Sequence, residues 1–278
     1  MEFSAVDYDY PNGIAALSNI TLSVNSGELV AVMGANGAGK STLVRHMNGL
    51  LKPTHGTVKI FGTDTRTSSA AALSKRVGII FQNPNNQLFA STVRAEVEFG
   101  LINLGFPKET VLNRTDWALK IFNLEEYSSR PPMELSGGEK KRLCIALVLA
   151  WEPDILILDE PTVGQDSEQK KKLIEIIKLM ITQEKSVLLV THDIEFVWPL
   201  QPRVVLMDRS KIIADGTAQR VLGDSAQLEE ASVLPPQLVD LWNGLGMNDQ
   251  LPRDEFAARD WIVRAHAKSS ENRKMNPE

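Results

Sequence analysis

Short apolar runs recur along the chain, separated by longer segments with helical spacing. Because nearly every residue of these runs is apolar, they predict strands that are buried on both faces, as in a parallel sheet covered by helices. The runs are LVAVM (29–33), VGIIF (77–81), ILILD (155–159), SVLLV (186–190) and VVLM (204–207). The predicted fold class is therefore α/β, with a parallel sheet flanked by helices.

Helices are predicted between these strands, at residues 40–50, 139–151 and 167–183. The last of these has apolar residues at 173, 174, 176, 177, 180 and 181, which is close to helical spacing. The N-terminal segment 3–28 alternates more loosely, with a turn signal at Pro11-Asn12-Gly13. It predicts an antiparallel edge.

Two further regions depart from this alternation. Residues of about 84–152 contain several helical patterns and no convincing strand, so we expect an inserted helical subdomain. Beyond Gly223, LPPQLVDLWNGLG and RDEFAARDWIVRAHA predict two short amphipathic helices. The expected organisation is a core of residues 1–222, a helical appendage of residues 223–268 and a disordered polar tail of residues 269–278.

Composition narrows the class of protein. The chain has 278 residues, a net charge of −5 and one cysteine, Cys144. The acidic balance argues against nucleic acid as a partner, since nucleic-acid binders usually carry a basic field. A single cysteine allows no intrachain disulfide and is expected as a small core residue. No apolar run approaches the roughly 18 residues that span a bilayer, so we expect no membrane-spanning segment.

The first chemical motif is GANGAGKS, Gly34–Ser41, which matches G-x4-G-K-[ST]. It follows a predicted strand and opens a predicted helix, the setting in which such a loop binds phosphates. Glycines let successive N–H groups point inward, and the helix N-terminus adds its positive end. Lys40 would reach the β- and γ-phosphates of ATP, and Ser41 would supply an oxygen ligand for Mg²⁺.

Polar residues follow three other predicted strands. Asp159 and Glu160 end ILILDE, His192 follows SVLLV, and Gln82 follows VGIIF. The carboxyl ends of parallel strands meet at one edge, where ligands bind. Asp159 is expected to hold Mg²⁺ through water, and Glu160 to accept a proton from the attacking water. His192 is a candidate contact for the γ-phosphate, and Gln82 for water or Mg²⁺.

The stretch LSGGEKKR, residues 135–142, adds a second glycine-rich helix start. Ser136 and Glu139 fit a capping box, but a cap alone does not need both Gly137 and Gly138, because glycine in a helix costs up to about 1 kcal/mol relative to alanine. Two glycines bare the backbone for close approach of an anion. We interpret this as a second cradle that covers the open side of a nucleotide held by another copy of the chain. The following basic run, 140–142, is interpreted as a solvated helix face.

With these motifs in order, the chain resembles the ATP-binding subunits of ABC transporters over about residues 1–222. The resemblance rests on GANGAGKS, the glutamine at Gln82, LSGGE, ILILDE, the loop TVGQD (162–166) and THD (191–193). It implies a P-loop ATPase core with an antiparallel edge sheet, and a head-to-tail dimer in which each LSGGE closes on the partner's ATP. Two departures are Glu139, where the family usually has Gln, and Gln165, where it prefers Leu.

The resemblance also assigns roles to individual residues. It implies Glu160, His192 and Gln82 as catalytic residues, and Ser41, Gln82 and Asp159 as Mg²⁺ ligands. Tyr10, or failing it Tyr8, matches the aromatic residue that stacks on adenine. The implied nucleotide contacts are Tyr10, Gly34, Ala35, Asn36, Gly37, Ala38, Gly39, Lys40, Ser41, Thr42, Ser136, Gly137, Gly138, Glu139 and Asp166.

A finer resemblance comes from QNPNNQLFASTV, residues 82–93, which is similar to the energy-coupling-factor group with its cobalt-type importers. It implies that residues 84–105 dock on a transmembrane coupling protein, at the cytoplasmic face of the membrane. It also implies import of a metal ion such as cobalt or nickel, or of a vitamin, and an appendage that helps to pair two ATPases. A homodimer and a heterodimer are both open.

Two other classes of protein are alternatives to a transporter subunit. The first is a soluble ATPase with one cassette, such as those of iron–sulfur cluster assembly. The second is a degenerate nucleotide-binding scaffold, against which the presence of both Glu160 and His192 argues.

Overall fold

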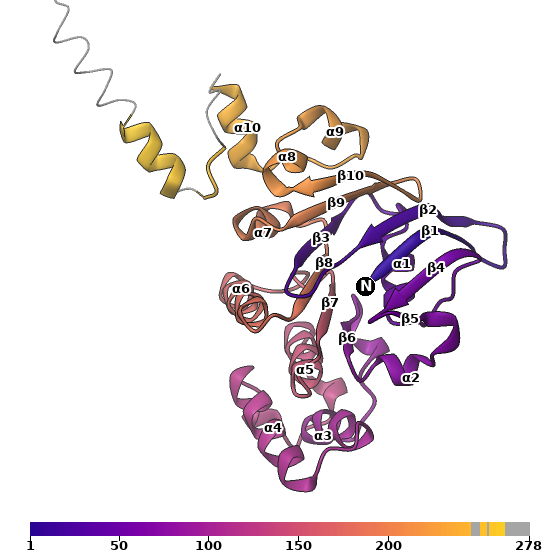
Figure 1. Cartoon of the computed structure of the whole chain (residues 1–278). Helices are drawn as coiled ribbons and strands as arrows, with labels where there is room; N and C mark the ends of the chain where they lie inside the picture. The colour runs from indigo at the N-terminus through magenta and orange to yellow at the C-terminus, as the bar shows by residue number, and fades with distance from the viewer. Residues whose placement is uncertain (246–250, 255, 265–278) are drawn as a thin grey trace, which may run out of the picture.

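The computed structural model describes residues 1–245, 251–254 and 256–264 (Figure 1). Their largest sheet has the strand order β10-β9-β3-β8-β7-β6. Strands β9, β3, β8, β7 and β6 run parallel, and β10 pairs antiparallel with β9 at the edge. The strands are β3 (Leu29–Met33), β6 (Val77–Ile80), β7 (Ile155–Asp159), β8 (Ser186–Val190), β9 (Arg203–Asp208) and β10 (Lys211–Thr217). The predicted parallel sheet is confirmed.

A second, antiparallel sheet has the order β2-β1-β4-β5. Its strands are β1 (Glu2–Asp9), β2 (Ala15–Ser23), β4 (His55–Ile60) and β5 (Thr63–Asp64). The predicted pairing and turn of the N-terminal segment are confirmed. The segment does not extend the edge of the parallel sheet, however, because its buried side chains, such as Phe3 and Ile20, pack onto the face of that sheet.

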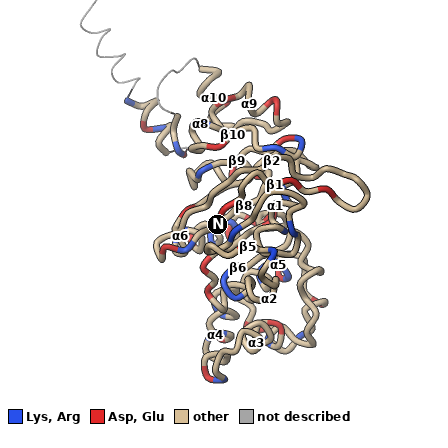
Figure 2. Tube along the Cα trace, turned by 45° about the vertical axis from the view of Figure 1, so that its right-hand side comes forward, with Lys and Arg blue, Asp and Glu red and all other residues tan. Residues whose placement is uncertain are grey.

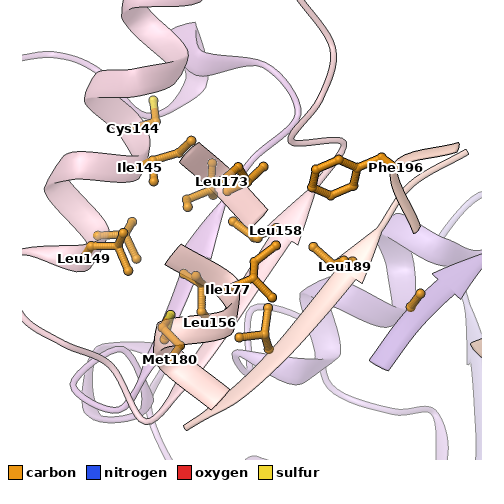
Figure 3. Close-up of a cluster of buried hydrophobic side chains, with 14 of the residues drawn as sticks. Cys144, Ile145, Leu149, Leu156, Leu158, Leu173, Ile177, Met180, Leu189 and Phe196 are labelled. Carbon is orange, nitrogen blue, oxygen red and sulfur yellow. The ribbon is translucent and has the colours of Figure 1, made fainter. Parts of the chain in front are cut away.

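Two hydrophobic clusters cover the two faces of the parallel sheet. On one face, alternate residues such as Ile155 and Ile157 pack against the antiparallel sheet and α1 (Lys40–Met47). On the other face, Leu156 and Leu158 meet side chains from three helices (Figure 3). These helices are α5 (Gly137–Leu149), α6 (Ser167–Thr182) and α7 (Ile194–Val197). Burial raises the pKa of the Cys144 thiol to about 12, as expected of a core cysteine.

Residues 84–152, all of which the structure describes, contain helices and no strand. The helices are η2 (Pro84–Asn86), α3 (Val93–Asn103), α4 (Lys108–Ile121), η3 (Glu125–Tyr127), η4 (Pro132–Glu134) and α5. Figure 1 shows α3 and α4 at the lower end of the molecule, away from the antiparallel sheet. The remaining short helices before β7 and after β8 are η1 (Thr65–Thr67), α2 (Ala70–Leu73) and η5 (Trp198–Leu200).

The C-terminal part is helical, as expected. It contains α8 (Ala218–Leu222), α9 (Ser225–Glu230), α10 (Gln237–Gly244) and a helix at residues 256–264. Trp242 and Trp261 stack edge to face with ring centroids 4.9 Å apart, and the indole N–H of Trp198 donates to the carbonyl of Pro252. The predicted tail of residues 269–278 lies outside the described residues.

Within the described residues, no helix is both long and apolar enough to cross a membrane. Lys and Arg are interspersed with Asp and Glu along the elements drawn in Figure 2.

Candidate nucleotide-binding site

The predicted site residues come from the carboxyl ends of neighbouring parallel strands. The Gly34–Ser41 loop follows β3, Gln82 follows β6, Asp159 ends β7, Glu160 comes directly after it, and His192 follows β8. Because these strands run parallel, their ends lie at one edge of the sheet. The fold thus brings these sequence-distant residues together.

Two glycines of this loop are required by close backbone packing. A Cβ on Gly34 would lie 2.0 Å from the carbonyl oxygen of Met207, and one on Gly39 would lie 2.4 Å from that of Ala16. Both residues also have positive φ, 144° and 101°. Side chains rarely adopt this region, so the loop can pass between β2 and β9 only with glycine at these positions.

Lys40 folds back onto the loop. Its ammonium group donates to the carbonyls of Gly34 and Ala35, at 2.8 and 2.9 Å. Burial lowers the pKa of Lys40, while Glu160 and Asp159 raise it. A phosphate would offer this cation an anionic partner that carbonyls cannot provide.

A cavity of about 270 Å³ unites most of these residues. It is lined by Tyr10, Ile14, Ala15, Ala16, Asn36, Gly37, Gly39, Lys40, Ser41, Thr42, Gln82, Asp159 and Glu160. Tyr10 stands at one end, with its hydroxyl 3.0 Å from the Thr42 hydroxyl. Tyr8 is not among the lining residues and packs edge to face on His46 at 4.8 Å. The geometry thus favours Tyr10 over Tyr8 as the residue that would stack on the adenine ring.

Glu160 is held in a strained conformation beside the loop. Its φ of 49° lies in the left-handed region, which a Glu residue seldom adopts. One carboxylate oxygen accepts from the Thr191 hydroxyl at 3.1 Å, and the other lies 2.9 Å from Nδ1 of His192. The His192 tautomer that carries its proton on Nδ1 would donate to this oxygen. His192 thus contacts Glu160 and does not itself line the cavity.

The residues present fit a hard cation such as Mg²⁺. Ser41, Gln82 and Asp159 bring hydroxyl, amide and carboxylate oxygens to the same cavity, and oxygen is the donor that Mg²⁺ prefers. Burial and the neighbouring Glu160 raise the pKa of Asp159, a cost that a bound cation would remove. The described residues hold no group of three or more His, Cys, Asp or Glu side chains that could bind a metal alone. Phosphate oxygens would complete the ligand set.

The LSGGE stretch forms the start of α5, outside this cavity. Ser136 caps the helix, and its N–H donates to Glu139 at 2.7 Å, so the predicted capping box is present. The Glu139 carboxylate is thereby turned onto its own helix, and these hydrogen bonds lower its pKa. The Glu139 side chain, one of the predicted nucleotide contacts, is therefore engaged in capping its own helix.

The two glycines of this stretch are not demanded by the chain itself. Neither Gly137 nor Gly138 has a positive φ. A Cβ on Gly137 would meet nothing within 4 Å, and one on Gly138 would lie 3.5 Å from the carbonyl of Gly164, an ordinary contact. The same contact places the 162–166 loop beside the helix start. Asp166 at the end of that loop caps α6 by accepting from the N–H of Gln169.

Lys141 is a correction to the sequence analysis. The run 140–142 is not a solvated face throughout, because Lys141 is only 2% exposed. Its ammonium group donates to the carbonyls of Phe81, Gln82 and Asp159. The missed signal is its spacing, since Lys141 lies three, four and seven residues before buried positions 144, 145 and 148 of the same helix.

Comparison with known proteins agrees with this geometry. Residues 17–163 match the ABC transporter family. The chain is 41% identical over 249 residues to the energy-coupling factor transporter ATP-binding protein EcfA of Methanothermobacter thermautotrophicus, across 89% of this chain and 80% of that protein. It is 39% identical over 247 residues to EcfA of Methanocaldococcus jannaschii, across 88% of each.

Solved structures give the same picture. CbiO1 from Clostridium perfringens, described as part of the ABC transporter complex cbiONQ, superposes with a TM-score of 0.70 and 35% identity, across 87% of this chain and 98% of that one. The ATP-binding cassette MJ0796, in a dimeric post-hydrolysis state bound to ADP and Pi, gives 0.71 and 31%, across 78% and 97%. The resemblance stated from the motifs is confirmed: the chain belongs to the ABC transporter family, as an ATP-binding subunit similar to those of energy-coupling factor transporters.

Proposed function

We propose that this chain is the ATP-hydrolysing subunit of an energy-coupling-factor importer. It works as a dimer at the cytoplasmic face of the membrane, docked on a transmembrane coupling protein. The cargo is a metal ion such as cobalt or nickel, or a vitamin. The observation that carries the proposal is the single cavity that joins the Gly34–Ser41 loop to Glu160.

The polar groups in and beside this cavity have distinct parts in the proposed hydrolysis. The inward N–H groups of the loop and Lys40 hold the phosphates, and Tyr10 stacks on the adenine. Mg²⁺, held by Ser41, Gln82 and Asp159, neutralises charge on the phosphates when bound. Glu160 accepts a proton from the attacking water, and His192 keeps its carboxylate aimed.

Dimerisation follows from the shape of the two cradles. In this proposal the cavity covers a bound triphosphate from one side, while Ser136, Gly137 and Gly138 lie outside the cavity and a Cβ on Gly137 would meet no atom within 4 Å. A head-to-tail pair would place this second cradle on the partner's ATP, with Asp166 at the contact. The MJ0796 cassette, one of the structural relatives, was itself solved as a dimer.

Docking is proposed for residues 84–105. Phe89 and Ile102 are 63% and 60% exposed there, and the rings of Phe89 and Phe99 meet edge to face at 4.7 Å. The buried carboxylate of Glu96 accepts from the N–H groups of Phe89 and Ala90, at 2.8 and 2.7 Å, which fixes the loop that carries Phe89. Phe89 on this fixed loop and Phe99 and Ile102 on α3 are exposed apolar side chains that suit an apolar partner surface.

Membrane association tests this function. In cells that carry the coupling protein, we expect the chain to sediment with the membrane fraction, and the variant Phe89→Ser to sediment less. The reason is the loss of an exposed apolar side chain from the docking surface. The measurement is quantitative immunoblotting of membrane and soluble fractions.

A matched control is Leu179→Ser, because Leu179 is also exposed, at 54%, but lies on α6. It should sediment as the wild type does. If deletion of the coupling protein left the sedimenting fraction unchanged, the transport function would be contradicted. A soluble ATPase of the iron–sulfur assembly type would then be favoured, although the relatives reported above are transporter subunits.

A further inference from the structure

Lys141 is a buried cation that the reaction outlined above does not use. It lies in the second turn of α5, and its ammonium group contacts three backbone carbonyls at the carboxyl ends of β6 and β7. The distances from its Nζ are 3.1 Å to the oxygen of Phe81, 3.4 Å to that of Gln82 and 3.4 Å to that of Asp159. Its three donors are therefore all engaged.

Burying an ammonium group is unfavourable unless its charge and donors are satisfied. Burial lowers the pKa of Lys141, whereas the carboxylates of Asp159 and Glu160 raise it. A leucine or methionine would fill the same space without that cost. Asp159 at the end of β7 and Glu160 directly after it thus offset part of the cost of burying this cation.

The three carbonyls belong to the backbone that carries two of the proposed Mg²⁺ ligands. Two of them belong to the segment that leaves β6, and the third belongs to the last residue of β7. The side chains that extend from this backbone include Gln82 and Asp159, two of the proposed Mg²⁺ ligands. Holding both carbonyls from one ammonium group fixes the separation of the two ligands.

The same helix also begins with the second cradle. Ser136 caps α5, and Lys141 lies five residues further on. One helix therefore connects the LSGGE stretch to the backbone of Gln82 and Asp159, two of this chain's proposed Mg²⁺ ligands. A shift of α5 would therefore displace the Lys141 ammonium group relative to Gln82 and Asp159.

We propose that Lys141 is a positioning residue that ties the second turn of α5 to the ends of β6 and β7 and so holds Gln82 and Asp159 at the spacing that Mg²⁺ requires. The inference rests on the proposed function, because it assumes that ATP binds with Mg²⁺ in this cavity. Lys141 contacts neither nucleotide nor metal in this role, and it acts through the backbone of the ligands.

Nucleotide binding with and without metal tests the inference. The dissociation constant of a fluorescent ATP analogue is measured in EDTA and in saturating Mg²⁺, for the purified full chain. The dissociation constant in EDTA divided by that in Mg²⁺ reports how much Mg²⁺ strengthens the binding of the analogue to the protein. For Lys141→Met we expect an unchanged constant in EDTA and a ratio lower by about tenfold, as for other residues that orient metal ligands.

Lys140→Met is the matched control, because Lys140 is the neighbouring lysine of the same helix and its ammonium group donates to the side chain of Asn85. Its ratio should equal that of the wild type. Lys141→Gln, which keeps N–H donors in the slot, is measured alongside and should retain more of the ratio than Lys141→Met. It also provides a test if Lys141→Met does not fold.

Two results would overturn the inference. One is a wild-type ratio in the folded Lys141 variants, and the other is an equal loss of affinity with and without Mg²⁺, which would mark a merely structural role. Wild-type protein that binds the analogue but cannot hydrolyse ATP would instead contradict the proposed function.

Discussion

At the scale of single residues, the phosphate loop shows two different uses of glycine. Gly34 is needed because a backbone carbonyl of β9 occupies the space of its Cβ. Gly37 has an open surrounding and is glycine only because its φ of 83° disfavours a side chain. The two positions should therefore respond differently to the same substitution.

We predict that Gly34→Ala lowers the midpoint of urea unfolding more than Gly37→Ala does. The second change costs about 1–2 kcal/mol for a left-handed alanine. The first adds a contact of 2.0 Å with the oxygen of Met207, so β3 or β9 must shift. Equal losses of stability would show that the contact with Met207 is readily relieved.

The sequence identified the residues whose chemistry follows from a motif, such as Lys40 and Glu160. It misplaced Lys141, because a lysine beside other charged residues is usually solvated. Only the register of α5, which begins at Gly137, turns this side chain toward the sheet. The contact of His192 with Glu160 likewise required the three-dimensional pairing of β7 with β8.

At the scale of elements, α5 joins structural and functional demands in one helix. Its C-terminal half packs Ile145 and Leu149 toward β7 and α6 (Figure 3). Its first turn carries glycines that its own packing does not require. These opposite demands allow stability and activity to be separated.

We predict that the double variant Gly137→Ala, Gly138→Ala folds at least as stably as the wild type, since alanine in a helix is favoured by up to about 1 kcal/mol per residue. Binding of ATP at the Gly34–Ser41 loop should be unchanged, because these glycines lie outside its cavity. Hydrolysis should fall strongly, because two methyl groups would obstruct the approach of the partner's nucleotide. Urea unfolding and phosphate release measure the two effects, and wild-type hydrolysis would remove the second cradle from the account.

The predicted elements were those with continuous or helical apolar patterns. The strands β3, β6, β7 and β8 are buried on both faces and were all predicted. The strands β4 and β10 were missed, because they lie in partly exposed positions and mix polar with apolar residues. β4 pairs with β1, which is distant in the sequence, and β10 pairs with β9, which directly precedes it. The alternation of apolar and polar residues within β4 and β10 does not reveal these pairings.

At the scale of the whole molecule, the proposed catalytic site is incomplete in a single chain. In the proposed function, one chain supplies the phosphate loop, the proposed Mg²⁺ ligands and the proposed base in one cavity, while the LSGGE helix start lies outside that cavity. Two chains in head-to-tail arrangement would complete both sites by symmetry. Hydrolysis is therefore expected to require a dimer.

The most direct measurement is the mass in solution of Glu160→Gln with and without ATP, by multi-angle light scattering, together with its phosphate release. We predict that this variant binds ATP, shifts from the 30.8 kDa chain mass to twice that value, and turns over hardly at all, because its amide cannot accept the proton of the attacking water. Phosphate release by Glu160→Gln at the wild-type rate, from a species that keeps the mass of one chain in ATP, would contradict the account.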